Sequence, residues 1–282
     1  MYDAVPGAST ATAPGKLEPP LTAKPSARTG WLRRLRTLAL PLALLGCWQF
    51  VSTQVLDRTT ATLLPPPTAV ANGFWELIST GELGHHTFTS LKREIVAFCW
   101  ASLAIPLGIA MGWWKTVNEQ VDPLIEILRP VPPLAWIPLS ILWFGIGDTQ
   151  NQFIIFLGIF FPILLNTVAG VKNIEPNLVR AARCLGASEI KVLRRVVLRA
   201  ALPQILTGVR VGLGVGWMAL VAAELVGANS GLGFLINDAR TVLRTDYVIV
   251  GMITIGIVGL IIDRVIRVVG RRVMPWSRAL ST

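Results

Sequence analysis

Six mainly apolar stretches of about 20 residues constrain this chain more than any other feature of its sequence. Crossing about 30 Å of hydrocarbon takes roughly 20 residues of α-helix. In a bilayer each backbone polar group must be bonded within its own segment, so such stretches form helices. The pattern predicts an all-α integral membrane protein with six transmembrane helices. The stretches are Leu38–Leu56, Ile95–Trp114, Leu128–Gly147, Phe153–Val171, Ile205–Val226 and Tyr247 to about Ile266.

The composition excludes several other classes of protein. Hydrophobic residues make up 52% of the 282 residues and charged residues only 15%, whereas soluble domains carry about 25% charged residues. The three cysteines, Cys47, Cys99 and Cys184, are an odd number without metal-type spacing, which favours neither a disulfide framework nor a zinc site. His85 and His86 are neighbours in a polar segment, and we expect them to be solvated loop residues and not metal ligands.

The distribution of basic residues predicts how the chain is oriented. The net charge is +10, and the basic residues form short blocks beside the apolar stretches, which favours membrane orientation over nucleic-acid binding. Six crossings put both termini on one side, and that side carries 19 lysines and arginines against five in the opposite loops. The positive-inside rule therefore places both termini and the Lys172–Arg199 loop in the cytoplasm.

Residues 1–30 differ in composition from residues 31–282. The first 30 residues are rich in proline, alanine, serine and threonine, so we expect a disordered cytoplasmic tail before a transmembrane domain at 31–282. An alternative is a signal peptide with a lipoprotein cleavage box, because Arg33–Arg36 precedes the box-like Leu44–Cys47. The apolar run continues past Cys47 and five more stretches follow, which favours an uncleaved first helix.

Prolines and glycines inside the stretches favour a transporter over a simple anchor. Pro106 and Pro162 interrupt the second and fourth stretches, and the carbonyls they leave unpaired are tolerated only beside other helices or a water-filled path. The fifth stretch contains four glycines, Gly208, Gly212, Gly214 and Gly216. Small residues let helices approach closely, and close packing explains these glycines as well as a role in lining a path does.

Ionisable residues inside a membrane are costly and often functional. Arg210 lies within two turns of the cytoplasmic end of the fifth stretch, where its side chain either reaches the interface or contacts an anion in transit. Glu224 lies near the outer end, and a carboxylate repels anions, so we expect it to tie the Gly227–Asp246 loop in place. Helix packing explains the presence of Trp143 and Asn166 in these stretches as well as a role in lining the path does. The candidates for the path or its gate are Arg129, Trp143, Asn166, Arg210, Glu224, Gly233 and Phe234.

The basic segment at about 174–203 is amphipathic but too charged to cross a bilayer. Its apolar residues recur at helical spacing on both sides of Gly186. A glycine at this place is typical of a helix stop with a left-handed backbone, and Ser188 of a new N-cap. The segment thus predicts two short helices meeting at Gly186. Their apolar stripe needs cover from the membrane surface, from the bundle itself or from a partner.

Residues of this segment resemble a known family signature. Ala181-Ala182, Gly186 four residues later and the ending Leu202-Pro203 are similar to the "EAA" signature of permease subunits of binding-protein-dependent ABC importers. Arg180 stands where the signature has its glutamate, as in the taurine-type branch, which predicts an acidic partner surface at that point. Five more motifs resemble the taurine, alkanesulfonate and nitrate branch, and the likeness covers about residues 35–277. These motifs are Arg129–Pro138, Trp143–Gly147, Leu206–Arg210, Ala222–Leu225 and Gly231–Phe234.

The resemblance implies a type I importer in a bacterial inner membrane. The chain would form the path for a small anion such as taurine, an alkanesulfonate or nitrate. Its partners would be a second permease copy in a homodimer, two ATPase subunits and an external substrate-binding protein. The chain has no Walker A sequence and no catalytic grouping, so we expect no enzyme activity, no metal site, and ATP with Mg²⁺ only on the ATPase. The docking residues would be Arg180, Ala181, Ala182, Gly186, Ala187 and Ser188.

An ion-driven secondary transporter of a small organic anion is the alternative of another class. Such carriers show inverted repeats and a carboxylate near the membrane midplane. This chain has no evident repeat, and the carboxylates inside its stretches, Glu224 and Asp263, lie toward the ends. The sequence therefore favours the ATP-driven importer.

Overall fold

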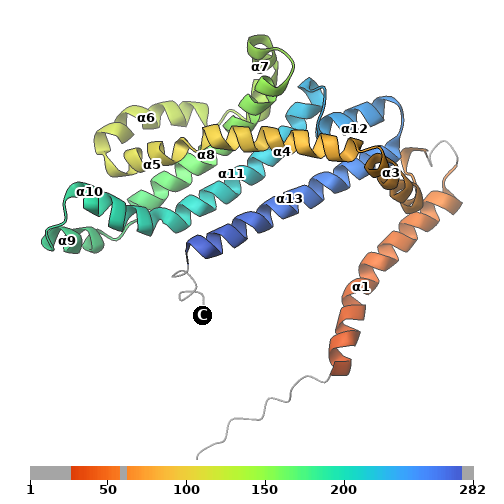
Figure 1. Ribbon diagram of the computed structural model, residues 1–282, viewed down its shortest axis with the longest axis horizontal. Coiled ribbons are helices and arrows are strands. Elements are labelled where there is room, and N and C mark those ends of the chain that lie inside the picture. The colour runs from red at the N-terminus through yellow and green to blue at the C-terminus, as the bar shows by residue number, and fades with distance from the viewer. Residues whose placement is uncertain (1–26, 58–61, 275–282) are drawn as a thin grey trace, which may run out of the picture. The chain divides into compact units, whose positions relative to one another are not determined.

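The computed structural model describes residues 27–57 and 62–274, and the regular structure of these residues is entirely helical (Figure 1). The chain divides into two compact units, Met1–Trp48 and Gln49–Thr282. Helix α1, Ala27–Phe50, continues into a short π-helix, Val51–Val55. Of the predicted tail, residues 1–26 lie outside the described residues, and residues 27–30 already belong to α1.

The remaining elements all belong to the second unit. They are α3 Pro67–Ser79, α4 Glu82–Ala101, α5 Ala104–Trp113, α6 Lys115–Leu128, a 3₁₀ turn Pro133–Trp136, α7 Ile137–Phe144, α8 Asp148–Lys172, α9 Pro176–Cys184, α10 Glu189–Val192, a π-helix Leu193–Val197, α11 Leu198–Gly227, α12 Leu232–Thr241 and α13 Thr245–Val273.

Four helices among the described residues are long and apolar enough to cross a membrane. These are Glu82–Trp113, Asp148–Lys172, Glu189–Gly227 and Thr245–Val273. They contain the fourth, fifth and sixth predicted stretches, and the second except for its last residue, Trp114. The first stretch corresponds to a shorter apolar helix, Ala39–Val55.

The third predicted stretch, Leu128–Gly147, is not one helix. Helix α6 ends at Leu128, and after a break the chain resumes helical structure at Pro133, with the two parts bent by 80°. Prolines cause the break, because each lacks an N–H and disfavours the helical conformation of the residue before it. Pro132 accordingly has the extended ψ of 141°. The bent pair is either a fifth, broken span or a re-entrant loop. The prediction of a single helix for this stretch was therefore wrong.

Helices α8 and α11 form the centre of the second unit and run side by side (Figure 1). The core-facing side of α8 is made of fully buried isoleucines such as Ile155 and Ile159. Glycines of α11 allow the close approach: a Cβ on Gly208 would lie 2.7 Å from the Cβ of Asn166, and one on Gly212 would lie 2.9 Å from the carbonyl oxygen of Ile159. These two glycines therefore serve helix packing.

The helices before α5 differ from expectation at one place. His85 and His86 lie inside α4, which begins at Glu82, and not in a solvated turn. Helix α3 begins at Pro67, with Pro66 at its N-cap position. It is held to the start of α13 by Arg244, whose guanidinium donates to Glu76 at 3.1 Å. Hydrogen bonds from Tyr247 and Arg244 lower the pKa of Glu76.

Candidate functional site

A buried ionic cluster joins α4, α8 and α11 to the segment before α12. The guanidinium of Arg93 donates to Glu224 Oε1 at 2.8 Å, to Asp148 Oδ1 at 2.6 Å and to the backbone oxygen of Ser230 at 2.6 Å. Arg93 is 2% exposed and Glu224 is 1% exposed. Buried charges are tolerated when they are paired and fully hydrogen-bonded, and this arrangement meets both conditions.

The same cluster satisfies the N-terminus of α12. Ser90 donates to the Glu224 carboxylate at 2.8 Å and accepts from the Leu232 N–H at 2.9 Å. The Gly233 N–H donates to Glu224 Oε2 at 2.9 Å. First-turn N–H groups have no partner inside their own helix, and a carboxylate is favourable at the positive end of the helix dipole. We call Ser90, Arg93, Asp148, Glu224 and Ser230 the α12 clamp.

Two gate candidates from the sequence, Glu224 and Gly233, meet at this clamp, and the third, Phe234, follows Gly233 on α12. Glu224 contacts Gly233 as described, and a Cβ on Gly233 would lie 2.6 Å from the Val221 carbonyl oxygen, so no larger residue fits there. Phe234 is half-buried, with its ring centroid 5.9 Å from that of His86. The His86 Nδ1 accepts a hydrogen bond from the Gly231 N–H at 3.0 Å. The start of α12 is thus tied to both α4 and α11.

Sequence reasoning missed most of the clamp. It counted Arg93 with the outer loop because the predicted span began at Ile95, and it gave no role to Ser90 or Asp148. The signal was present in α4, where the buried residues recur at helical spacing. These residues are Leu83, Ser90, Arg93, Glu94, Ala97 and Ala101.

A second functional region is the helix–glycine–helix segment formed by α9 and α10. Gly186 has a φ of +78°, which confirms the predicted left-handed backbone. The Ala187 N–H donates to the Ala182 oxygen at 3.1 Å and the Gly186 N–H to the Arg183 oxygen at 2.9 Å. This bond pair is the Schellman motif that ends helices. Ser188 occupies the N-cap position of α10 but makes no side-chain cap bond.

The two faces of this segment differ in exposure. Leu185 is 88% exposed at the tip, and Arg180, Ala181 and Ser188 are also exposed. Ala182 and Ala187 instead pack against a core formed by Val192, Val197 and Ile205. The protein's own bundle therefore covers part of the apolar stripe, and the tip remains open.

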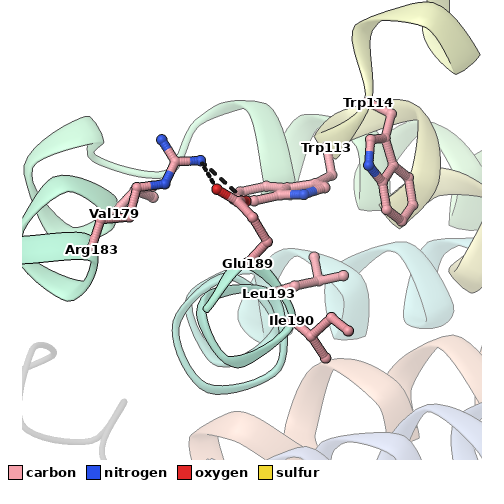
Figure 2. A pocket seen from close by; sticks show the side chains of 7 residues that line it. All are labelled: Trp113, Trp114, Val179, Arg183, Glu189, Ile190 and Leu193. Atoms are coloured by element: carbon pink, nitrogen blue, oxygen red, sulfur yellow. Dashed lines mark hydrogen bonds and ion pairs between the residues drawn. The ribbon is translucent and has the colours of Figure 1, made fainter. Parts of the chain in front are cut away.

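A cavity of about 430 Å³ lies between the α9–α10 segment and the end of α5 (Figure 2). Arg183 and Glu189 face each other there, with nitrogen and oxygen 2.9 Å apart, and so connect α9 to α10. Trp113 and Trp114 contribute aromatic rings from the end of α5. Both charged side chains are more than half exposed, so their pairing adds little stability and serves mainly to orient the two short helices.

The remaining sequence candidates do not join either site. Arg129 is exposed at the end of α6. Trp143 is 55% exposed and belongs to an aromatic group with Trp136, Phe144 and Phe153.

Asn166 and Arg210 have local partners. The amide of Asn166 donates to the Pro162 oxygen at 2.8 Å and accepts from Gln204 at 3.1 Å, joining α8 to α11. Arg210 donates to Asp263 of α13 at 2.7 Å. Arg210 and Glu224 lie too far apart along α11 to bond each other. Glu224 is bound instead by Ser90, Arg93 and the Gly233 N–H.

Comparison with known proteins identifies the family. Residues 104–275 match the model of the family described as "Binding-protein-dependent transport system inner membrane component". The chain belongs to this family. The permease is 45% identical to a putative ABC transporter permease of Methanocaldococcus jannaschii over 86% of this chain and 92% of that protein. It is 44% identical to the taurine transport system permease protein TauC of Escherichia coli, over 83% and 86% of the two chains.

Other comparisons agree. The permease is 38% identical to a putative aliphatic sulfonates permease, SsuC of Bacillus subtilis, over 89% of this chain and 90% of that one. An inward-facing structure of the MetNI methionine ABC transporter matches with a TM-score of 0.55 at 21% identity, covering 67% of this chain and 92% of the other, which shows a shared fold.

Family membership fixes several general properties of the permease. It is a multi-pass membrane protein and the transport component of an ABC importer, with ATP hydrolysed in a separate ATPase subunit. An ATPase and a substrate-binding protein are the partners that the family implies. These findings decide against the ion-driven carrier.

Proposed function

We propose that this permease carries a small anion of the taurine, alkanesulfonate or nitrate class and docks on its ATPase through residues 174–203. The α9–α10 segment carries the docking proposal: its tip residue Leu185 is 88% exposed, while the partly buried Ala182 packs against the protein's own core. A rigid segment with an exposed apolar tip can transmit a displacement of a partner to the spans. Arg180 is exposed on the same segment and suits an acidic site on the ATPase.

The substrate class rests on the relatives. TauC is named for taurine, SsuC for aliphatic sulfonates, and CmpB of Synechococcus elongatus, 35% identical over 86% of this chain, for bicarbonate. All of these substrates carry a compact anionic group. Arg129, Trp143 and Asn166 remain candidates for lining the path. Uptake of labelled taurine, ethanesulfonate and nitrate with the cognate binding protein tests the class, and uptake of none of them contradicts it.

The assembly that we propose contains two copies of this permease, an ATPase pair that binds ATP and Mg²⁺, and an external binding protein. Both termini and the α9–α10 segment face the cytoplasm, whereas α12 and its clamp lie toward the binding protein. Phe234, with the buried Leu235 beside it on α12, then stands at the outer end of the path. Closure of the ATPase pair moves the α9–α10 segment, and the bundle changes between inward-open and outward-open states.

Substitution of Gly186 tests the docking role. We expect Gly186→Val to weaken copurification of the ATPase and to abolish substrate-stimulated ATP hydrolysis. A side chain at a φ of +78° costs about 1 kcal/mol or more and reshapes the tip. Gly81→Val is a matched control, because Gly81 also has a φ of +78° and open space around its Cβ position.

The control separates docking from backbone strain. Gly81→Val, on the opposite side of the membrane in this proposal, should leave the ATPase bound. Normal ATPase assembly and transport in Gly186→Val would contradict the proposal. Ala182→Asp is less diagnostic, since Ala182 also packs in the protein core; Leu185→Asp alters the exposed tip without that loss.

A further inference from the structure

Helices α11 and α13 lie side by side (Figure 1), and a groove runs between them. Its wider part, about 210 Å³, is lined by Leu206, Arg210, Ile266, Arg267 and Arg271 among others. A narrower part of about 80 Å³ shares Arg210 and Ile266 with it and continues along the helices. The groove thus has a basic wide end and a narrow extension.

The wide end has more positive than negative charge. Arg210 and Arg267 both bond the one carboxylate that lines the groove, Asp263, at 2.7 Å and 2.5 Å. The side chains of these arginines are still 51% and 44% exposed. A guanidinium has five N–H donors, so one aspartate leaves donors of both arginines facing the groove. Arg271 also lines this end. This end suits an anion with several acceptor oxygens.

The narrow extension is mainly apolar. Its apolar lining includes Leu213, Gly214, Gly259 and Ile262, and the Arg210–Asp263 pair stands where it joins the wide end. A Cβ on Gly214 would meet no atom within 4 Å, so the space beside it is open. Trp217 bounds this part, and its indole N–H donates to the Ile255 oxygen at 3.2 Å, which fixes the ring. The extension has the chemistry of a slot for one hydrocarbon chain.

We propose that this groove binds an anionic diacyl phospholipid of the surrounding membrane. The phosphodiester contacts Arg210, Arg267 and Arg271, and one acyl chain lies along Gly214. Only an amphiphile fills both parts, since a free inorganic anion would leave the apolar slot empty. Basic pockets between membrane helices are a known setting for anionic headgroups.

Lipid titration of the full-length permease in neutral detergent, followed by native mass spectrometry, tests the charged end. We expect phosphatidylglycerol to bind much more tightly than phosphatidylcholine. Arg267→Gln with Arg271→Gln should weaken phosphatidylglycerol binding about 30-fold, since one arginine near an anionic lipid is worth about fivefold. The matched control is Arg194→Gln with Arg195→Gln, an exposed basic pair elsewhere, which should leave this binding unchanged.

Gly214→Leu tests the apolar slot without changing any charge. An added Cβ at Gly214 meets no atom within 4 Å, and the rest of the leucine side chain would extend into the slot that Gly214 lines, so phosphatidylglycerol binding should weaken while the melting temperature is kept. Equal binding of both lipids, or equal loss in the control pair, would overturn the proposal. Displacement of phosphatidylglycerol by millimolar inorganic phosphate would instead mark a soluble-anion site. Loss of the lipid on dimerisation would mark an interface between copies, and either result overturns the proposal.

Discussion

Two buried glutamates show how strongly the surroundings of a residue decide its effect. Glu224 and Glu94 are 1% and 2% exposed. Glu224 accepts hydrogen bonds from Arg93, Ser90 and Gly233. Both carboxylate oxygens of Glu94 lack a hydrogen-bond partner among the described residues. Because an unbonded buried polar group costs free energy and a paired one need not, substitutions at the two positions should have opposite effects.

Removing the cation of the clamp should destabilise the permease. Arg93→Met leaves the Glu224 carboxylate buried without its counter-charge, and breaking a buried pair costs about 3–5 kcal/mol. We therefore expect a lower melting temperature in detergent and loss of transport. Combining Arg93→Met with Glu224→Leu should recover part of the stability, because no lone charge then remains. If Arg93→Met alone were as stable as the native chain, the clamp would not be needed to hold the fold.

Glu94→Leu is expected to stabilise the permease. It removes two unbonded oxygens at little cost in volume, which should raise the free energy of unfolding by about 1–3 kcal/mol. Chemical denaturation of the purified protein measures the change. Glu224→Leu is the control of the same residue type and burial, and it should lower stability. A large loss of stability in Glu94→Leu would mean that Glu94 has a partner in the membrane-embedded assembly.

At the scale of single elements, α12 depends on two features of its first turn. Its leading N–H groups are bonded by the clamp, and Gly233 lets the helix lie directly against α11, where the Val221 oxygen and the Glu224 Cβ would be 2.6 and 2.7 Å from an added Cβ. Backbone oxygens cannot move aside as a flexible side chain can. The position of α12 is therefore sensitive to any increase in size at Gly233.

Gly233→Val should displace α12 and impair transport. Overpacking of this kind typically costs about 1–3 kcal/mol. Helix α12 and the α9–α10 segment lie at opposite ends of α11 (Figure 1). We therefore expect the ATPase to remain bound to the variant, which copurification measures. Gly84→Val is the control, since Gly84 lies in α4 with nothing within 4 Å of an added Cβ. Normal substrate uptake by Gly233→Val would show that α12 is only a linker.

At the scale of the whole molecule, membrane orientation is the open property with the most direct test. The described cysteines Cys47, Cys99 and Cys184 are all exposed, so they are first replaced by serine. A cysteine at Ser188 should then resist a membrane-impermeant thiol reagent in intact cells, whereas one at Gly81 should react. Both positions are exposed in the structure, so burial does not confuse the result. Labelling in the opposite sense would contradict the cytoplasmic placement of the α9–α10 segment.

Local sequence information was enough for features that depend on neighbouring residues. Apolar runs predicted the helices around α8, α11 and α13, because a helix needs only its own backbone bonds and an apolar surface. The left-handed Gly186 followed from the helical spacing on either side of it. The third stretch failed because hydropathy was counted across Pro130–Pro133, although prolines break a helix whatever the hydropathy around them.

Only the tertiary structure revealed the α12 clamp, the unpaired Glu94 and the groove between α11 and α13. Arg93 and Glu224 are 131 positions apart, and Arg93 and Asp148 are 55 apart. Helical spacing around Arg93 shows which residues share a face of α4, but it does not show that this face is buried against Glu224 and Asp148. That burial depends on which helices pack together, and the packing is set by surface shape, such as the glycines of α11, and not by local propensity.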